Sequence, residues 1–167
     1  YATFPNNGGY TQSRTYYKVE DSEGNVILEK DPVRETVIKD TTAHYINSIL
    51  SDVLNTPAGT GYSGRLNDMT SAGKTGTTND NSDGWFVGYT PSLAFGVWVG
   101  GDERDIHFSS MSYGQGAASA LPVAANFLKK VYADGALGYD PEEEFEVPDE
   151  LENTWSEEKI AAAEPDS

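Results

Sequence analysis

The clearest periodic pattern in the chain lies between residues 41 and 54. Apolar side chains recur there about every three to four residues, the spacing that places them on one face of an α-helix; they are Ala43, Ile46, Ile49, Leu50, Val53 and Leu54. Asp40 or Thr41 can cap the start of this helix. Pro57 prevents its continuation, because proline lacks the backbone N–H that the helix needs. The pattern therefore predicts a helix over residues 41–54.

Three stretches typical of β-strands follow, at residues 69–78, 85–90 and 93–100, with short polar links between them. Short links favour antiparallel neighbours, since parallel strands need a long crossover. In the last stretch both alternating sets of side chains are apolar, so we expect both faces of the sheet to be covered by helices. One such helix is predicted from Leu121 to about Gly135. The aromatic side chains expected in the core of the sheet are Trp85, Phe86, Tyr89, Phe95 and Trp98.

A smaller hairpin is expected before the first helix. Between Tyr10 and Leu28, polar and apolar side chains alternate around a turn at Ser22–Asn25, in which Gly24 can adopt positive φ. These elements together predict an α+β fold class, with an antiparallel sheet flanked by helices. The exposed edge of that sheet is expected where further strands or helices of a longer protein would lie.

Charge divides the chain into two parts. The net charge is −16, and much of it lies after residue 139, where large apolar groups are few. We therefore expect a domain over residues 1–135 and an acidic, flexible tail over residues 136–167. Only 11 basic residues are scattered along the sequence, which argues against nucleic-acid binding and against adhesion to anionic lipid. The absence of cysteine rules out a disulfide framework or a thiolate metal site.

The candidate functional residues lie on the first predicted strand, at Lys74–Thr78. This segment brings together an ammonium group, several hydroxyls and a glycine. In an extended chain Thr75 and Thr77 project to the same side, and Gly76 has no Cβ to obstruct a ligand. Such a strand suits a peptide-like ligand, which could pair with the strand while Lys74 and the hydroxyls hold its carboxylate.

Other chemistries fit these residues less well. A phosphate-binding loop needs a glycine five positions before Gly73, where Asp68 stands, and a carboxylate repels phosphate. The polar link at residues 79–84 lacks the pattern of a calcium loop, so we interpret it as a solvated turn. His44 and His107 are too far apart in sequence to indicate a local metal pair. We expect no metal and no cofactor.

The surrounding sequence distinguishes Lys74 from an ordinary surface lysine. Lys74–Thr78, Asp83–Pro91 and Val97–Gly100 resemble the third motif and the next two strands of penicillin-binding proteins. The opening residues 1–9 resemble the segment that precedes this region in the bifunctional class A members. The resemblance runs from residue 1 to about residue 135. It implies the C-terminal portion of the transpeptidase fold that penicillin-binding proteins share with serine β-lactamases.

This resemblance also implies roles for the strand. Lys74 would help to bind the substrate carboxylate and support proton transfer, and the hydroxyls of Thr75 and Thr77 would contact that carboxylate. The backbone N–H of Thr77 would supply half of the oxyanion hole. Gly76 and Thr78 complete the expected substrate-binding set. Family members cleave a D-Ala-D-Ala bond through a serine acyl-enzyme and pass the acyl group to an amine of a second peptidoglycan strand; penicillins acylate the same serine.

The chain departs from the family pattern because it offers no credible nucleophile. The family motifs S-x-x-K and S-x-N are expected before Tyr1, and no S-x-N string occurs here. Ser71 and Lys74 have the first spacing but stand on a predicted strand, where positions three apart face opposite sides. Ser156 and Lys159 repeat the spacing in the acidic tail. Since the sequence also begins with Tyr1 rather than Met, we expect an excised piece of a longer protein, inactive by itself.

Two functions stay open from the sequence. The first is the substrate-binding part of a D,D-transpeptidase, within a peptidoglycan synthase anchored N-terminally to the bacterial membrane at its extracytoplasmic face and carrying an upstream glycosyltransferase. Its expected partners are stem peptides, β-lactams and the remainder of the transpeptidase domain. The second is a catalytically silent module that binds wall peptides. A piece of a β-lactamase or carboxypeptidase is disfavoured, because the strand at residues 85–90 resembles that of the synthases.

Overall fold

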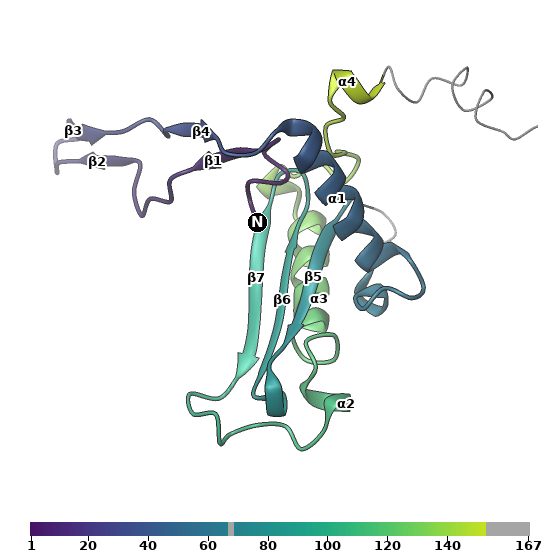
Figure 1. Ribbon diagram of the computed structural model, residues 1–167. Helices are drawn as coiled ribbons and strands as arrows, with labels where there is room; N and C mark the ends of the chain where they lie inside the picture. The colour runs from purple at the N-terminus through teal and green to yellow at the C-terminus, as the bar shows by residue number, and fades with distance from the viewer. Residues whose placement is uncertain (67–68, 153–167) are drawn as a thin grey trace, which may run out of the picture.

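The computed structural model describes residues 1–66 and 69–152. At its centre lies a three-stranded antiparallel sheet in chain order, formed by β5 (Ala72–Thr77), β6 (Asp83–Tyr89) and β7 (Ala94–Gly100), as Figure 1 shows. The link between β6 and β7 is closed by the Thr90 amide, which donates to the Leu93 carbonyl at 2.8 Å. The antiparallel meander predicted from the short links is therefore confirmed.

One face of the sheet forms the core. Phe86 of β6 pairs with Val97 of β7, and residues that pair across strands share a face. The helix α3 (Ala120–Ala133) packs on this face against β6 and β7 and confirms the helix predicted from Leu121. The buried cluster is Leu54, Phe86, Ala120, Leu121 and Ala124, with Phe95, Val97, Val99 and Ala117 packed against it.

On the opposite face, α1 (Asp40–Asn55) packs along β5 and its Asn47 bonds to Tyr89, but the β7 side of that face is exposed, so the expectation that helices cover both faces holds only in part for the described residues. Trp85 and Trp98 pair across β6 and β7 with their ring centroids 6.4 Å apart, and their exposed fractions are 44% and 43%. Of the aromatic residues expected in the core, Phe86 and Tyr89 are buried and Phe95 is half-buried against α3. Apolar alternation cannot tell a covered face from one that these residues leave open.

The predicted first helix is confirmed as α1 (Asp40–Asn55), which packs along β5. The expected cap at Asp40 or Thr41 is wrong, because the capping position is Lys39, which makes no side-chain cap bond. Asp40 instead lies in the first turn, where its carboxylate stabilises the positive end of the helix dipole. The helix ends before Pro57, as predicted, and the Thr56 amide donates back to the Asp52 carbonyl.

A long two-stranded arm extends from the sheet before α1 (Figure 1). Its tip is the predicted hairpin, β2 (Lys18–Glu20) paired with β3 (Val26–Glu29), and Gly24 has the expected positive φ of 85°. Its base, β1 (Gly9–Thr11) paired with β4 (Arg34–Thr36), escaped prediction, because each strand is only three residues long. Many large apolar side chains of the arm are exposed, namely Tyr10, Tyr16, Tyr17, Val19, Val26, Ile27, Leu28, Val33 and Val37.

The remaining elements are short: the 3₁₀ turns η1 (Tyr62–Gly64), η2 (Asn79–Asn81) and η3 (Gly135–Leu137), and the helices α2 (Met111–Gly114) and α4 (Asp149–Glu152). No helix in the described part of the chain is both long and apolar enough to cross a membrane.

Part of the predicted acidic tail packs against the domain. The Phe145 ring lies on Tyr89 with centroids 5.6 Å apart, and Leu151 is buried. Ser92 and Asn7 donate hydrogen bonds to Glu143 and Glu146. The domain boundary at residue 135 stays a prediction, and the last fifteen residues of the predicted tail, 153–167, lie outside the described residues.

Candidate functional site

Lys74–Thr77 lie on β5, which is an edge strand among the described residues. Its neighbour in the sheet is β6, and its other side carries no strand of this part of the chain. Thr75 and Thr77 pair with Phe86 and Gly84, so both threonines lie on the face that α3 covers, as predicted from their spacing. Lys74 lies on the opposite face. An extended peptide could therefore add to the outer edge of β5 by backbone hydrogen bonds.

The Lys74 ammonium has no carboxylate partner in the described structure. Its Nζ donates to the neighbouring Thr75 carbonyl at 2.9 Å, and the side chain is exposed. The ion pair found among the described residues joins Lys18 to Glu20, far along the arm. The positive charge at the strand is thus available to an anionic ligand.

The two threonine hydroxyls are held by residues from flanking loops. Thr75 Oγ1 donates to Thr60 Oγ1 at 2.9 Å, and Thr77 Oγ1 accepts from the Gly116 amide at 3.1 Å. Because the Thr77 hydroxyl acts here as an acceptor, its own proton is free to be donated to a ligand. Thr60 and Gly116 escaped the sequence analysis, since loop residues far from the strand carry no periodic signal.

A second network fastens the end of the strand. Thr78, which follows β5, donates from Oγ1 to Asp83 Oδ2 at 2.8 Å, and Ser82 Oγ donates to the same oxygen at 2.9 Å. Trp98 Nε1 donates to Asp83 Oδ1 at 2.9 Å. The hydrogen bonds from Trp98, Thr78 and Ser82 lower the pKa of the Asp83 carboxyl, with a lesser contribution from the charge of Arg104. Asp83 is therefore an anionic acceptor shared by Trp98 of β7 and by two residues of the turn between β5 and β6.

Asp83 was interpreted from sequence as part of a solvated turn, and its role was missed. The turn itself is present, with Asp80 and Asn81 at positive φ of 60° and 56°. The available signal was an aspartate at the end of a turn, where its carboxylate often bonds to nearby groups. The partner Trp98 lies 15 residues away, and only the strand register brings it close.

The structure describes one of the two serine–lysine pairs, Ser71 and Lys74. Ser71 is buried immediately before β5, whereas Lys74 is exposed, so the pair is divided as expected for a strand. Ser156 and Lys159 lie outside the described residues.

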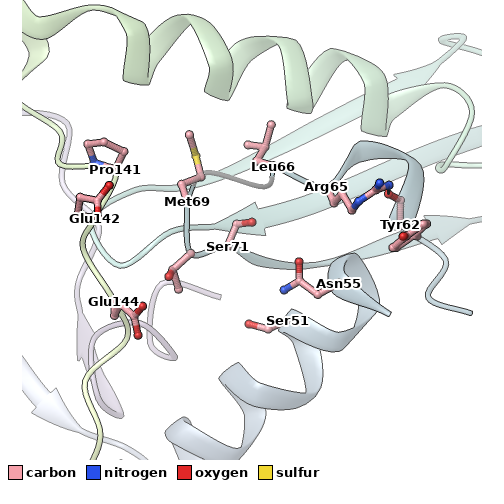
Figure 2. Close-up of a pocket in the computed structure, with 11 residues that line it drawn as sticks. Ser51, Asn55, Tyr62, Arg65, Leu66, Met69, Ser71, Pro141, Glu142 and Glu144 are labelled. Atoms are coloured by element: carbon pink, nitrogen blue, oxygen red, sulfur yellow. Dashed lines mark hydrogen bonds between the residues drawn. The ribbon is translucent and has the colours of Figure 1, made fainter. Parts of the chain in front are cut away.

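A separate polar pocket lies near the start of β5 and contains none of Lys74–Thr78. Figure 2 shows Glu142 and Glu144 at one side of it and Arg65 at the opposite side. The Arg65 guanidinium lies 4.0 Å from the centre of the Tyr62 ring and donates to the Tyr62 carbonyl. The lining residues are Ser51, Asn55, Tyr62, Arg65, Leu66, Met69, Thr70, Ser71, Pro141, Glu142 and Glu144.

The histidines are apart from both regions. His44 Nδ1 lies 3.4 Å from the Glu146 carbonyl and His107 Nδ1 lies 3.1 Å from the Phe108 carbonyl. Within residues 1–66 and 69–152, no three side chains of His, Cys, Asp or Glu gather closely enough to hold a metal ion.

The family model of the penicillin-binding protein transpeptidase domain matches residues 1–129. The chain belongs to this transpeptidase family. Penicillin-binding protein 1A of Clostridium acetobutylicum is 42% identical over 106 residues, which are 62% of this chain and 13% of that protein. Penicillin-binding protein 1A of Aquifex aeolicus is 35% identical over 153 residues, 90% of this chain and 19% of that protein. The chain thus spans less than a fifth of these two transpeptidase-family relatives.

Solved structures of penicillin-binding proteins share the fold. Penicillin-binding protein 1A from Haemophilus influenzae aligns with a TM-score of 0.73 and 20% identity, covering 88% of this chain and 26% of that one. PonA1 from Mycobacterium tuberculosis aligns with a TM-score of 0.65 and 29% identity, covering 87% and 38%. Penicillin-binding protein A from the same organism, solved as an imipenem acyl-enzyme complex, aligns at 0.59 with 17% identity, covering 76% and 28%. The expected α+β transpeptidase fold is confirmed.

Proposed function

We propose that this chain is the substrate-binding part of a class A peptidoglycan D,D-transpeptidase whose serine nucleophile lies elsewhere in a longer protein. The observation that carries this proposal is the free edge of β5, which has an ammonium without a carboxylate partner at Lys74 on one face and the hydroxyls of Thr75 and Thr77 on the other. An edge strand with a cation and hydroxyls suits an extended peptide that ends in a carboxylate.

In this proposal the stem peptide lies along β5. Lys74 from one face of the strand and the hydroxyls of Thr75 and Thr77 from the other would bind the terminal carboxylate across the free edge, and the Thr75 hydroxyl would exchange its bond to Thr60 for this one. The Thr77 N–H donates to the oxyanion as the carbonyl becomes tetrahedral. Gly76 has no side chain on this strand, which leaves room for the ligand. A Cβ added there would lie 3.2 Å from Trp85 Cβ, which is tighter than an ordinary contact. The hydroxyl of Thr78 is occupied by Asp83, so Thr78 would contribute through its backbone.

The chemistry proceeds in two acyl transfers. The serine oxygen attacks the carbonyl of the D-Ala-D-Ala bond, an ester forms, and the terminal D-Ala leaves as the amine after taking up a proton. An amine of a second stem peptide then attacks the ester, forms the cross-linking amide and restores the serine hydroxyl. A β-lactam would enter the same site, because attack on its carbonyl opens the ring and leaves the acyl group on serine. Support comes from the imipenem acyl-enzyme formed by a protein of this fold.

We also propose a boundary for the domain and a setting for it within a longer protein. The match to residues 1–129 supports a domain that ends near residue 135, followed by the acidic segment 136–167. The class A resemblance of residues 1–9, together with relatives named penicillin-binding protein 1A, leads us to propose a longer protein that is anchored at the extracytoplasmic face and also carries a glycosyltransferase.

Labelling by a fluorescent penicillin tests this function. The full-length protein should be labelled, and Lys74→Ala should label at least about tenfold more slowly, which corresponds to about 1.4 kcal/mol of lost transition-state stabilisation. Lys129→Ala is the matched control, because Lys129 is an exposed lysine on α3 and should leave labelling unchanged. The isolated 167-residue chain should not be labelled. A folded full-length protein that takes no label contradicts the enzyme and favours the silent wall-peptide binding module.

A further inference from the structure

The turn that follows the substrate-binding strand is fastened by a single carboxylate. We propose that Asp83 is a positioning residue for the transpeptidase site: its carboxylate fastens the end of β5 to β6 and β7 and thereby fixes the backbone of Thr77. This inference rests on the proposed function, because it concerns the donor that the Thr77 N–H would supply.

The geometry places Asp83 at the junction of all three strands. Its two carboxylate oxygens have different donors: Oδ2 accepts from Thr78 and Ser82, and Oδ1 accepts from Trp98 of β7. The backbone adds a reciprocal pair, in which the Thr78 amide donates to the Asp83 carbonyl at 3.1 Å and the Asp83 amide donates to Thr78 Oγ1 at 3.0 Å. An ionised carboxylate forms stronger hydrogen bonds than a neutral acceptor.

Thr77 lies between this network and a second fixed point. On its C-terminal side the chain passes directly into Thr78, and on its side-chain face Oγ1 accepts from the Gly116 amide. A Cβ at Gly116 would lie 2.4 Å from the Gly76 carbonyl oxygen, so the loop before α3 packs directly on β5. Two supports on either side of one residue hold its N–H in a fixed direction, which is what an oxyanion donor requires.

Asp83 itself is not placed to react with a substrate. Both of its carboxylate oxygens accept hydrogen bonds, from Thr78, Ser82 and Trp98, and these bonds lower its pKa and keep it ionised. Its effect on catalysis would therefore pass through the position of Thr77. A misplacement of about 1 Å in an active-site group can cost about 100-fold in rate.

The test measures the rate of acylation by a fluorescent penicillin in the full-length protein. Asp83→Ala should slow acylation by about 10- to 100-fold through loss of orientation. Asp83→Asn should recover part of that rate, because its amide oxygen can still accept from Trp98. Asp80→Asn is the matched control: Asp80 lies in the same turn, makes no side-chain hydrogen bond among the described residues, and sits at a positive φ that asparagine tolerates. The control should acylate at the wild-type rate.

A purely structural role gives a different result. If Asp83→Ala lowers the melting temperature but acylates within about twofold of wild type at a temperature where both are folded, the proposal is overturned. If Asp83→Ala does not fold, Trp98→Phe takes its place, since it removes one donor and keeps an aromatic ring. Trp98→Phe and Asp83→Asn should then be non-additive in acylation rate, because they act on one network; additive effects would overturn the proposal.

A second readout separates this inference from the proposed function. Hydrogen exchange at the Thr78 amide reports the turn without any reaction, and it should quicken in Asp83→Ala but not in Asp80→Asn. If the wild-type protein takes no penicillin, the proposed function fails while the exchange measurement still decides whether Asp83 fixes the strand. Unchanged exchange in Asp83→Ala would count against the network itself.

Discussion

At the scale of single residues, a buried hydrogen bond ties α1 to the sheet. Tyr89 Oη donates to Asn47 Oδ1 at 2.9 Å, and Asn47 Nδ2 donates onward to the Phe4 carbonyl at 3.2 Å. Tyr89 is fully buried and Asn47 is 2% exposed, so water cannot replace a lost partner. The pair therefore joins the N-terminal segment, the helix and β6 at one point.

Tyr89→Phe should lower the free energy of unfolding by about 1–3 kcal/mol, because it leaves the Asn47 oxygen buried and unbonded. Urea denaturation at neutral pH measures this difference. Tyr17→Phe is the control, since Tyr17 is 67% exposed and the same change there should have little effect.

The same variant should respond differently to alkali. Burial raises the pKa of the Tyr89 hydroxyl above its ordinary value of 10.0, with a smaller contribution from Tyr1. Above pH 10 the unfolded chain loses a proton that the folded protein retains, so the stabilisation from this proton falls as the pH rises toward the folded pKa. The deficit of Tyr89→Phe relative to wild type should therefore shrink above pH 10. A deficit that stays constant would show that Tyr89 is not protected from ionisation by burial.

The placement of the side chains on β5 could be predicted from sequence, whereas the residues that form hydrogen bonds with them could not. The positions of Lys74, Thr75 and Thr77 follow from alternation along an extended strand, which is a local property. The contacts of Asp83 with Trp98 and of Thr77 with Gly116 depend on strand register and on a loop that returns 39 residues later. Local sequence patterns carry no information on contacts between residues that are distant in sequence.

At the scale of elements, the loop before α3 meets β5 and β6 at a glycine. A Cβ on Gly116 would lie 2.3 Å from the Trp85 carbonyl oxygen and 2.4 Å from that of Gly76. Both atoms belong to the backbone of paired strands and cannot move aside cheaply. The glycine thus allows the close approach that brings the Gly116 amide to Thr77.

Gly116→Ala should destabilise the fold by about 1–3 kcal/mol, because the loop must move off the sheet. Thermal unfolding of the protein measures this loss, and acylation should slow with it. Gly96→Ala is the control within the same sheet, since its new Cβ would make an ordinary contact with Val87 at 3.9 Å. Equal melting temperatures for the two variants would refute the close packing at Gly116.

Element types were predictable because their signals are periodic. The helix over α1 and the meander of β5, β6 and β7 follow from spacing and short links. The exposure of the sheet face that carries Trp85 of β6 and Trp98 of β7 was not predicted. The sequence pattern of apolar residues is the same whether a helix covers such a face or the described chain leaves it exposed. Three-residue strands such as β1 and β4 are too short for alternation to show.

At the scale of the whole molecule, the acidic segment closes over the junction of helix and sheet. Phe145 lies against Tyr89, and the segment continues past a buried Pro148 to Leu151. These apolar contacts hold a run of carboxylates near a chain that is already strongly negative.

Phe145→Ala should release this segment and destabilise the protein by about 1–3 kcal/mol, less than a fully buried phenylalanine would, because Phe145 is half-buried. A protease specific for glutamate should then cut near residues 142–146 faster than in wild type. Val147→Ala is the control, since Val147 is 42% exposed. Equal cleavage rates for both variants would show that Phe145 does not hold the segment.

The open edges of the sheet have a consequence for the behaviour of concentrated solutions. Among the described residues the sheet ends at β5 on one side and β7 on the other, and such edges act as templates on which another molecule can add a strand. The charge of −16 keeps copies apart over about one Debye length, roughly 10 Å in 0.1 M salt. Added salt shortens that range and lets the edges of neighbouring molecules meet. Colloidal stability of this chain therefore comes from its charge rather than from its topology, and a high-salt buffer works against it.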